Sequence, residues 1–119
     1  MKHLDLKHLR NIVGDNPEFL VQVLEIFLKS APRDLAGLHT GVGERDPEVI
    51  RFHAHKLKSA CGAIGFNSAF DCFKRIEVLA RAGDPADEIA AELSAADVLC
   101  ASCIGDMPGT INELRQAGR

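Results

Sequence analysis

Residues 50–68 read IRFHAHKLKSACGAIGFNS and contain both a helical repeat of apolar side chains and the signal that ends the helix. The apolar residues recur at intervals of three or four: Ile50, Ala54, Leu57, Cys61 and Ile64. That interval is the period of one face of an α-helix. Gly65 follows where the helix is expected to stop, and Asn67 is expected to cap the next helix. The stretch therefore predicts two helices joined by a tight loop.

The same repeat extends along the rest of the chain. It predicts helices over residues 4–12, 17–40, 47–64, 68–82 and 85–107, and no strand. Before three of these helices a capping residue precedes a proline at the first helical position, in Asn16-Pro17, Asp46-Pro47 and Asp84-Pro85. Pro32 lies inside the second helix and is expected to kink it or split it. The tail from Pro108 to Gln116 is expected to add one or two further turns.

Four long amphipathic helices with short loops favour an all-α fold, an antiparallel up-down-up-down four-helix bundle with a short extra N-terminal helix. A chain of 119 residues is expected to form one domain over residues 1–119. Because four helices can close one core, we expect a monomer.

Composition and charge exclude several classes of function. The net charge of −3 argues against nucleic acid as the main partner, because phosphate backbones attract basic surfaces. No apolar run approaches the roughly 18–20 residues of a membrane span. The N-terminal sequence has Asp5 where a signal peptide needs an apolar stretch, so the expected location is the cytoplasm.

Four cysteines fall within the apolar helical pattern: Cys61, Cys72, Cys100 and Cys103. Free cysteine behaves as a small hydrophobic residue, so we expect reduced thiols in the core and no metal site. The C-x-x-C spacing of Cys100 and Cys103 leaves open a redox pair or half of a zinc site.

His55 lies opposite the apolar stripe of its helix and is therefore expected to face solvent. Five other residues fall within about 60° of it on a helical wheel: Arg51, Phe52, Lys58, Ser59 and Gly62. Ser59 and Gly62 are small, and a glycine inside a helix costs about 1 kcal/mol relative to alanine. These small side chains leave room for another protein to approach the imidazole.

His55, Leu57, Lys58 and Gly65 together resemble the signature of histidine phosphotransfer (HPt) domains, roughly His-x-Leu-Lys-Gly with a second glycine six residues later. Ser59 stands where the family usually has glycine. The resemblance implies a phosphorelay in which His55 accepts a phosphoryl group from a receiver-domain aspartate or a histidine kinase. It then passes the group to another receiver.

The resemblance also implies roles for the neighbours of His55. Lys58 would offset the charge of the phosphoryl group, and Gly65 would be structural. A docking surface for the partner would comprise Arg51, Phe52, Ser59 and Gly62. The partners would be response-regulator receiver domains and a hybrid sensor histidine kinase. The protein would be a phosphocarrier, not an autonomous enzyme, without a cofactor of its own, since the receiver supplies Mg²⁺.

Two other functions remain open on the sequence alone. One is a helical adaptor that binds receivers or kinases without carrying phosphate. The other is a Cys/His metal or redox protein. The His-x-His pair of His53 and His55 does not support a shared metal, because on a helix the two rings diverge by about 200°. His53 is expected at the edge of the core with a hydrogen-bond partner. A basic cluster that includes Arg81 is expected on a solvated face.

Overall fold

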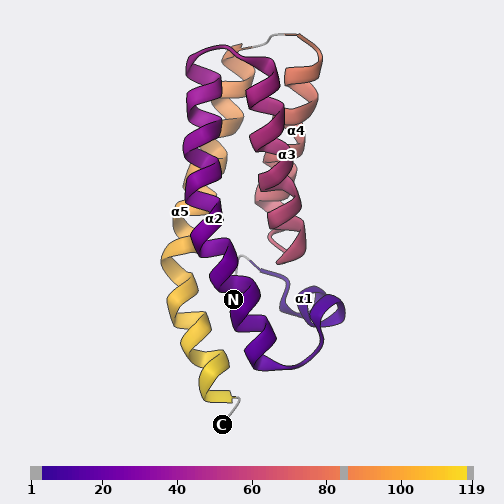
Figure 1. Ribbon diagram of the computed structural model, residues 1–119, viewed down its shortest axis with the longest axis vertical. Coiled ribbons are helices and arrows are strands. Elements are labelled where there is room, and N and C mark those ends of the chain that lie inside the picture. Colours follow the sequence, from indigo (N-terminus) through magenta and orange to yellow (C-terminus); the bar gives the residue numbers. More distant parts are fainter. Residues whose placement is uncertain (1–3, 84–85, 118–119) are drawn as a thin grey trace.

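The structure, a computed structural model, describes residues 4–83 and 86–117. Five helices follow one another along the chain: α1 (Leu6–Val13), α2 (Pro17–Gly43), α3 (Pro47–Ala63), α4 (Asn67–Arg81) and α5 (Ala86–Ala117) (Figure 1). The described part of the chain contains no strand, so the predicted all-α class is confirmed.

The four long helices form a closed bundle. α2 packs on α3 and α5, and α4 packs on the same two helices, so that every long helix has two neighbours. Consecutive helices run in opposite directions (Figure 1), which confirms the up-down-up-down arrangement. The fully buried side chains at its centre include Leu38, Leu57, Phe73, Ile76 and Met107.

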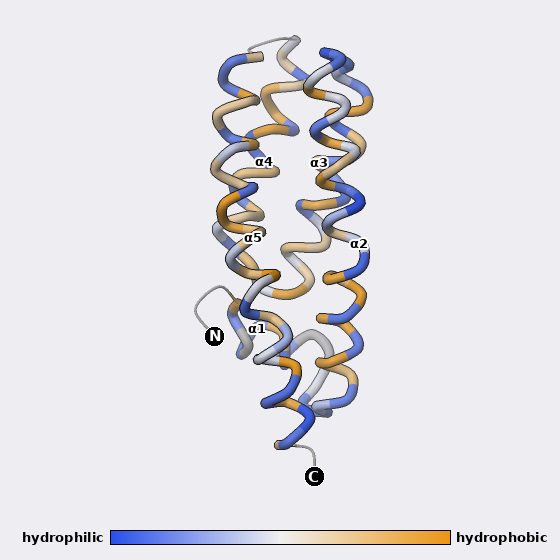
Figure 2. Tube along the Cα trace, turned by 90° about the vertical axis from the view of Figure 1, so that its left-hand side faces the viewer, coloured by the Kyte–Doolittle hydropathy of each residue, from blue (hydrophilic) through white to orange (hydrophobic). Residues whose placement is uncertain are grey.

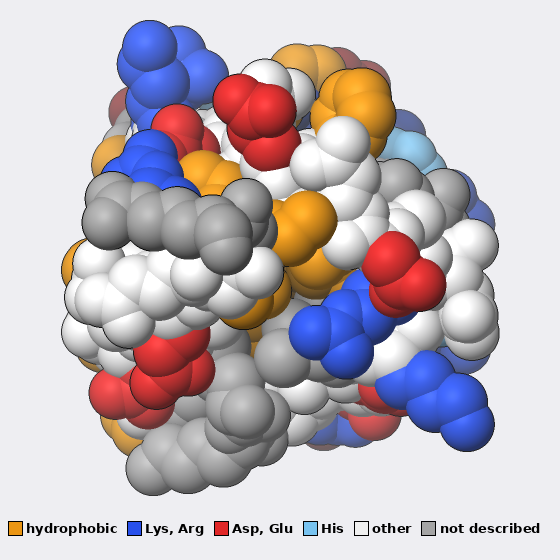
Figure 3. Space-filling view, turned by 90° about the horizontal axis from the view of Figure 1, so that it is seen from below, with side chains coloured by type: hydrophobic (Ala, Val, Ile, Leu, Met, Phe, Trp, Pro, Cys, Tyr) orange, Lys and Arg blue, Asp and Glu red, His pale blue; other side chains and the backbone are white. Residues whose placement is uncertain are grey.

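The lower part of the molecule has a different construction, because α3 and α4 are shorter than α2 and α5. Below the α3–α4 turn, α2 and α5 continue as a pair with hydrophobic residues along both (Figure 2). α1 lies beside this pair, and its Leu9 is fully buried. Phe66 of the turn packs edge-on against Phe27 of α2, with ring centroids 6.5 Å apart. From below, hydrophobic side chains are visible among charged ones at this end (Figure 3).

The predicted caps are partly correct. The Asn16 side chain accepts a hydrogen bond from the backbone N–H of Glu18, and that of Asp46 from the N–H groups of Glu48 and Val49. The prediction for Asn67 is wrong, because it is the first residue of α4 and Phe66 occupies the capping position. The predicted cap Asp84 and Pro85, where the last helix was expected to begin, lie outside the described residues.

α2 is longer than predicted and continues through Pro32 to Gly43 without a break. Its lower part leans away from the direction of its upper part (Figure 1), in keeping with a kink rather than a split. The helix ends without a left-handed glycine, and the left-handed residue is instead Arg45, at φ 53°.

The last helix extends beyond the predicted end at residue 107, because α5 continues through Pro108 to Ala117 and includes the tail where one or two further turns were expected. The apolar period also continues, and Ile111 and Leu114 are buried in the core. Arg115 forms an ion pair with Glu25 of α2, which holds the extension against the lower part of that helix. The free energy of this packing outweighs the cost of a proline inside the helix.

All four cysteines are buried, with free thiols. Burial raises the pKa of Cys100 to about 12 and that of Cys103 to about 11, with smaller contributions from neighbouring thiol and acidic groups. Zinc binding and thiol exchange need the thiolate. The buried environment of the four cysteines therefore favours core packing over metal or redox chemistry. Among the described helices, none is long and apolar enough to cross a membrane.

Candidate functional site

His55 lies on the outer face of α3, with 63% of its side chain exposed. Its Nδ1 atom is 3.4 Å from Oε2 of Glu77 on α4. This contact fixes the orientation of the ring. It also sets the tautomer, because a nitrogen that faces a carboxylate is expected to carry the proton. The second ring nitrogen, Nε2, is then unprotonated in the neutral imidazole and has its lone pair available.

Glu77 is the centre of the polar contacts around His55, although only 8% of its side chain is exposed. Oε2 also lies 3.1 Å from Nζ of Lys58, and Oε1 lies 3.2 Å from a terminal nitrogen of Arg81. Burial by itself would raise the pKa of Glu77, but the Lys58 ammonium and the His55 ring outweigh it and hold this pKa below its ordinary value. The carboxylate is therefore ionised at neutral pH.

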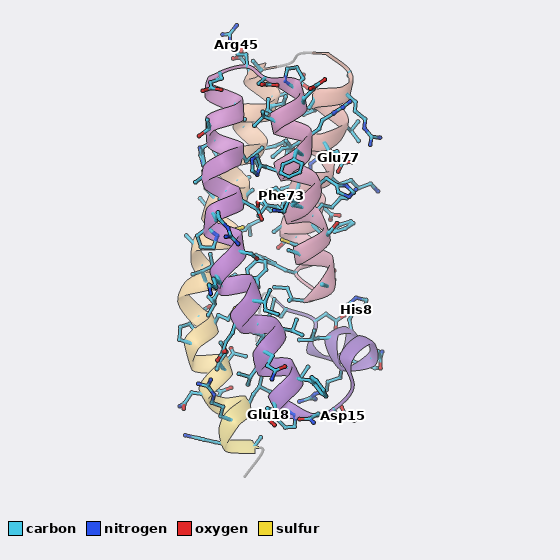
Figure 4. The ribbon with its side chains drawn as sticks, in the orientation of Figure 1. His8, Asp15, Glu18, Arg45, Phe73 and Glu77 are labelled. Atoms are coloured by element: carbon cyan, nitrogen blue, oxygen red, sulfur yellow. The ribbon has the colours of Figure 1, made fainter. Side chains whose placement is uncertain are left out.

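Glu77 is the residue that sequence reasoning missed. It lies four residues after Phe73 and three before Ala80, on the buried stripe of α4. An acidic residue within an apolar stripe is a usable signal, because a buried carboxylate needs cationic or hydrogen-bonding partners. Figure 4 shows Glu77 in the upper half of the bundle, away from His8 and the α1 end.

Lys58 lies on the same helix as His55, three residues later, and its side chain is largely covered at 23% exposed. Its ammonium group shares Oε2 of Glu77 with the His55 ring. The structure thus brings His55 and Lys58, the two residues of the predicted site, together through their shared contact with Glu77. Arg81, expected on a solvated face, also contacts Glu77, although its side chain is 65% exposed.

The four predicted docking residues share the outer face of α3 with His55. Arg51, Phe52 and Ser59 are exposed, and Gly62 is half-buried. A Cβ atom at Gly62 would lie 3.4 Å from a ring carbon of Phe70, which is an ordinary van der Waals contact. The glycine is therefore not required by the packing of the bundle itself.

Gly65 has a structural position in the α3–α4 turn. Its φ of +72° is in the left-handed region, and a Cβ atom there would lie 2.8 Å from the backbone oxygen of Asp5. The N–H of Asp5 donates to the Gly65 carbonyl oxygen at 3.0 Å. Glycine thus allows the segment before α1 to pack directly on the turn.

His53 faces the opposite side of α3, toward α2. Its Nδ1 lies 3.3 Å from Oδ1 of the buried Asp34, and its side chain is 22% exposed. The ring packs so closely on Gly37 that a Cβ atom there would overlap it. His53 is therefore enclosed between two helices, whereas His55 is open to solvent.

Two further histidines of the described residues, His8 and His39, lie away from this site. Among the described residues, His8 is exposed, and Nε2 of His39 lies 2.9 Å from Oδ1 of Asp97. No group of three or more His, Cys, Asp or Glu side chains in the described ranges is arranged to hold a metal ion.

A four-helix bundle that presents one exposed histidine beside a lysine and a buried acid defines a class of helical proteins suited to carrying a group on an imidazole. Comparison with protein families gives the particular family: the Hpt domain model matches residues 22–117, and the chain belongs to the Hpt domain family. No curated protein and no solved structure gives a significant match.

Membership of the family establishes the general role. Hpt domains serve phosphotransfer in two-component signalling, as phosphocarriers rather than enzymes. They interact with receiver and kinase domains.

Proposed function

We propose that His55 is the phosphoacceptor and that this chain takes a phosphoryl group from a receiver-domain aspartate, or from a histidine kinase, and passes it to another receiver. One observation carries the proposal: the exposed His55 ring has Nδ1 held by the Glu77 carboxylate, with the Lys58 ammonium on the same oxygen. The other histidine of α3, His53, is enclosed against Asp34 and Gly37.

The contact at Nδ1 selects Nε2 as the reacting atom. In the neutral ring the Nδ1–H group donates a hydrogen bond to Glu77, and the lone pair on Nε2 attacks the phosphorus of an aspartyl phosphate. The N–P bond forms as the P–O bond to the aspartate breaks, and the aspartate leaves as a carboxylate. The proton stays on Nδ1, so the ring gains a positive charge that faces Glu77.

Phosphoryl transfer depends mainly on alignment and on neutralisation of charge. Lys58 supplies an ammonium beside the ring, and the partner receiver supplies Mg²⁺, so the chain needs no cofactor of its own. The proposed docking surface for the partner is the outer face of α3, with Arg51, Phe52 and Ser59 exposed and Gly62 half-buried. A monomer suffices, since the four long helices close the bundle.

The test is transfer from a panel of phosphorylated receiver domains to three chains: wild type, His55→Gln and His53→Gln. We expect acid-labile, base-stable label on wild type and on His53→Gln, and none on His55→Gln. Label that persists on a folded His55→Gln chain would show that His55 is not the nucleophile. Binding to a receiver without label on any chain would favour an adaptor that carries no phosphate.

A further inference from the structure

The buried acid beside His55 has a consequence for the direction of transfer. Resting on the proposed function of His55, we propose that Glu77 is an internal counter-anion of the phosphoacceptor site. It holds the Lys58 and Arg81 cations in the resting state and competes with the phosphoryl group for them after transfer. Glu77 is thus a positioning residue that favours passing the phosphoryl group on over storing it.

The contacts in the resting state support the first half of this proposal. The two carboxylate oxygens are divided among three groups: Oε2 faces His55 and Lys58, and Oε1 faces Arg81. Since only 8% of the Glu77 side chain is exposed, water replaces few of these contacts. Bonds between ionised partners are roughly twice as strong as neutral ones. The carboxylate therefore retains the largely covered Lys58 ammonium more strongly than the exposed Arg81.

The charges created by transfer support the second half. When Nε2 bonds to phosphorus and the receiver aspartate leaves, the ring becomes positive and the phosphoryl oxygens carry about two negative charges. Glu77 attracts the ring and repels the phosphoryl group, and these effects oppose each other. The Lys58 ammonium decides which of these two effects on phosphohistidine stability is larger, because it cannot give all of its hydrogen bonds to both anions at once.

The covered position of Lys58 sharpens this competition. Its side chain is 23% exposed, so the ammonium has a restricted range between the ring and α4. An ammonium has three N–H donors, and every donor retained by Glu77 is lost to the phosphoryl oxygens. Neutralising Glu77 should therefore release Lys58 to the phosphoryl group and stabilise phosphohistidine.

The chain offers a matched control for this idea. Asp34 is also a buried acid, and it lies 3.3 Å from His53 Nδ1 and 3.2 Å from Lys56 Nζ. It thus has the same kinds of partner as Glu77, but at the α2–α3 contact on the other side of α3. Asp34→Asn removes an equivalent buried charge without touching the His55 cluster.

The experiment measures the ratio of phosphorylated chain to phosphorylated receiver at the plateau of the transfer reaction. Glu77→Gln should raise this ratio about tenfold, the effect of one charge-assisted hydrogen bond gained by the phosphoryl group. Asp34→Asn should leave it unchanged. In a Lys58→Gln background, Glu77→Gln should have no further effect, which a merely structural role would not produce.

An unchanged or lower ratio in a folded Glu77→Gln chain overturns the proposal, as does an equal rise with Asp34→Asn. The wild-type chain gives a second readout that does not depend on folding of a variant. The ¹³C resonance of the Glu77 carboxyl should shift on phosphorylation as Lys58 redistributes, and an unmoved resonance overturns the competition. Label on His55→Gln is a separate result and overturns the proposed function instead.

Discussion

Substitution of Gly62 separates an effect on docking from an effect on stability most clearly, because the packing of the bundle does not require a glycine there. It lies within α3, two turns beyond His55 on the same face. In Gly62→Ala the new methyl group would lie 3.4 and 3.5 Å from two ring carbons of Phe70, both ordinary contacts. We therefore expect the variant to fold without rearrangement.

The magnitude follows from helix propensity. Replacing glycine by alanine inside a helix stabilises it by roughly 0.5–1 kcal/mol, and α3 ends at Ala63, so the lower end of this range applies. That corresponds to a rise in melting temperature of about 2–4 °C. A larger side chain, in Gly62→Gln, should obstruct an approaching receiver and slow phosphotransfer about tenfold or more, as over-packing of a close contact does.

The assay pairs thermal unfolding with the initial rate of transfer from a phosphorylated receiver. Gly105→Ala and Gly105→Gln are the matched controls, since Gly105 also lies inside a helix and a Cβ atom there would meet nothing within 4 Å. We expect the Gly105 variants to gain stability and transfer at the wild-type rate. If Gly62→Gln transfers as fast as wild type, the assignment of Gly62 to the docking surface is refuted.

Three further predictions concern the stability of the bundle. Gly37→Ala should destabilise it by about 1–3 kcal/mol in denaturant unfolding, because the new Cβ overlaps the His53 ring; a smaller loss would mean that the ring moves aside freely. The folded-state pKa of Glu77 is lowered, so its contribution is present above the ordinary pKa of about 4.5 and lost as pH falls through the folded value. The melting temperature of wild type should therefore fall more steeply below pH 4.5 than that of Glu77→Gln. Parallel curves of melting temperature against pH would contradict this. Leu114→Ala should cost about 2 kcal/mol in the same unfolding assay and Glu113→Ala less than 0.5, because only Leu114 is buried, and equal losses would show that the α5 extension does not pack.

The fold was largely predictable because the helical period and the caps agree with each other. Asn16 and Asp46 cap the helices that the apolar repeats define, and Gly65 marks the turn between α3 and α4. The failures arose where a local rule met tertiary packing. The last helix was expected to reach about residue 107 with one or two further turns, but burial of Ile111 and Leu114 sustains it through Pro108 to Ala117.

The site was predictable only in the part that lies on one helix. Helical geometry places His55 and Lys58 on a common face, because both belong to α3. Glu77 and Arg81 belong to α4, and no spacing along the chain indicates which residue of α4 lies beside His55. That pairing depends on how the two helices are aligned in the hairpin, which only the packed structure shows.

The measurement that tests the central claim most directly is the identification of the phosphorylated atom. The ¹⁵N-labelled chain is phosphorylated by a cognate receiver, and its imidazole nitrogens are followed by NMR at neutral pH. The account predicts that only His55 is modified, at Nε2, with the proton remaining on Nδ1 opposite Glu77. A phosphoryl group on Nδ1 of His55, or on His53, would contradict it.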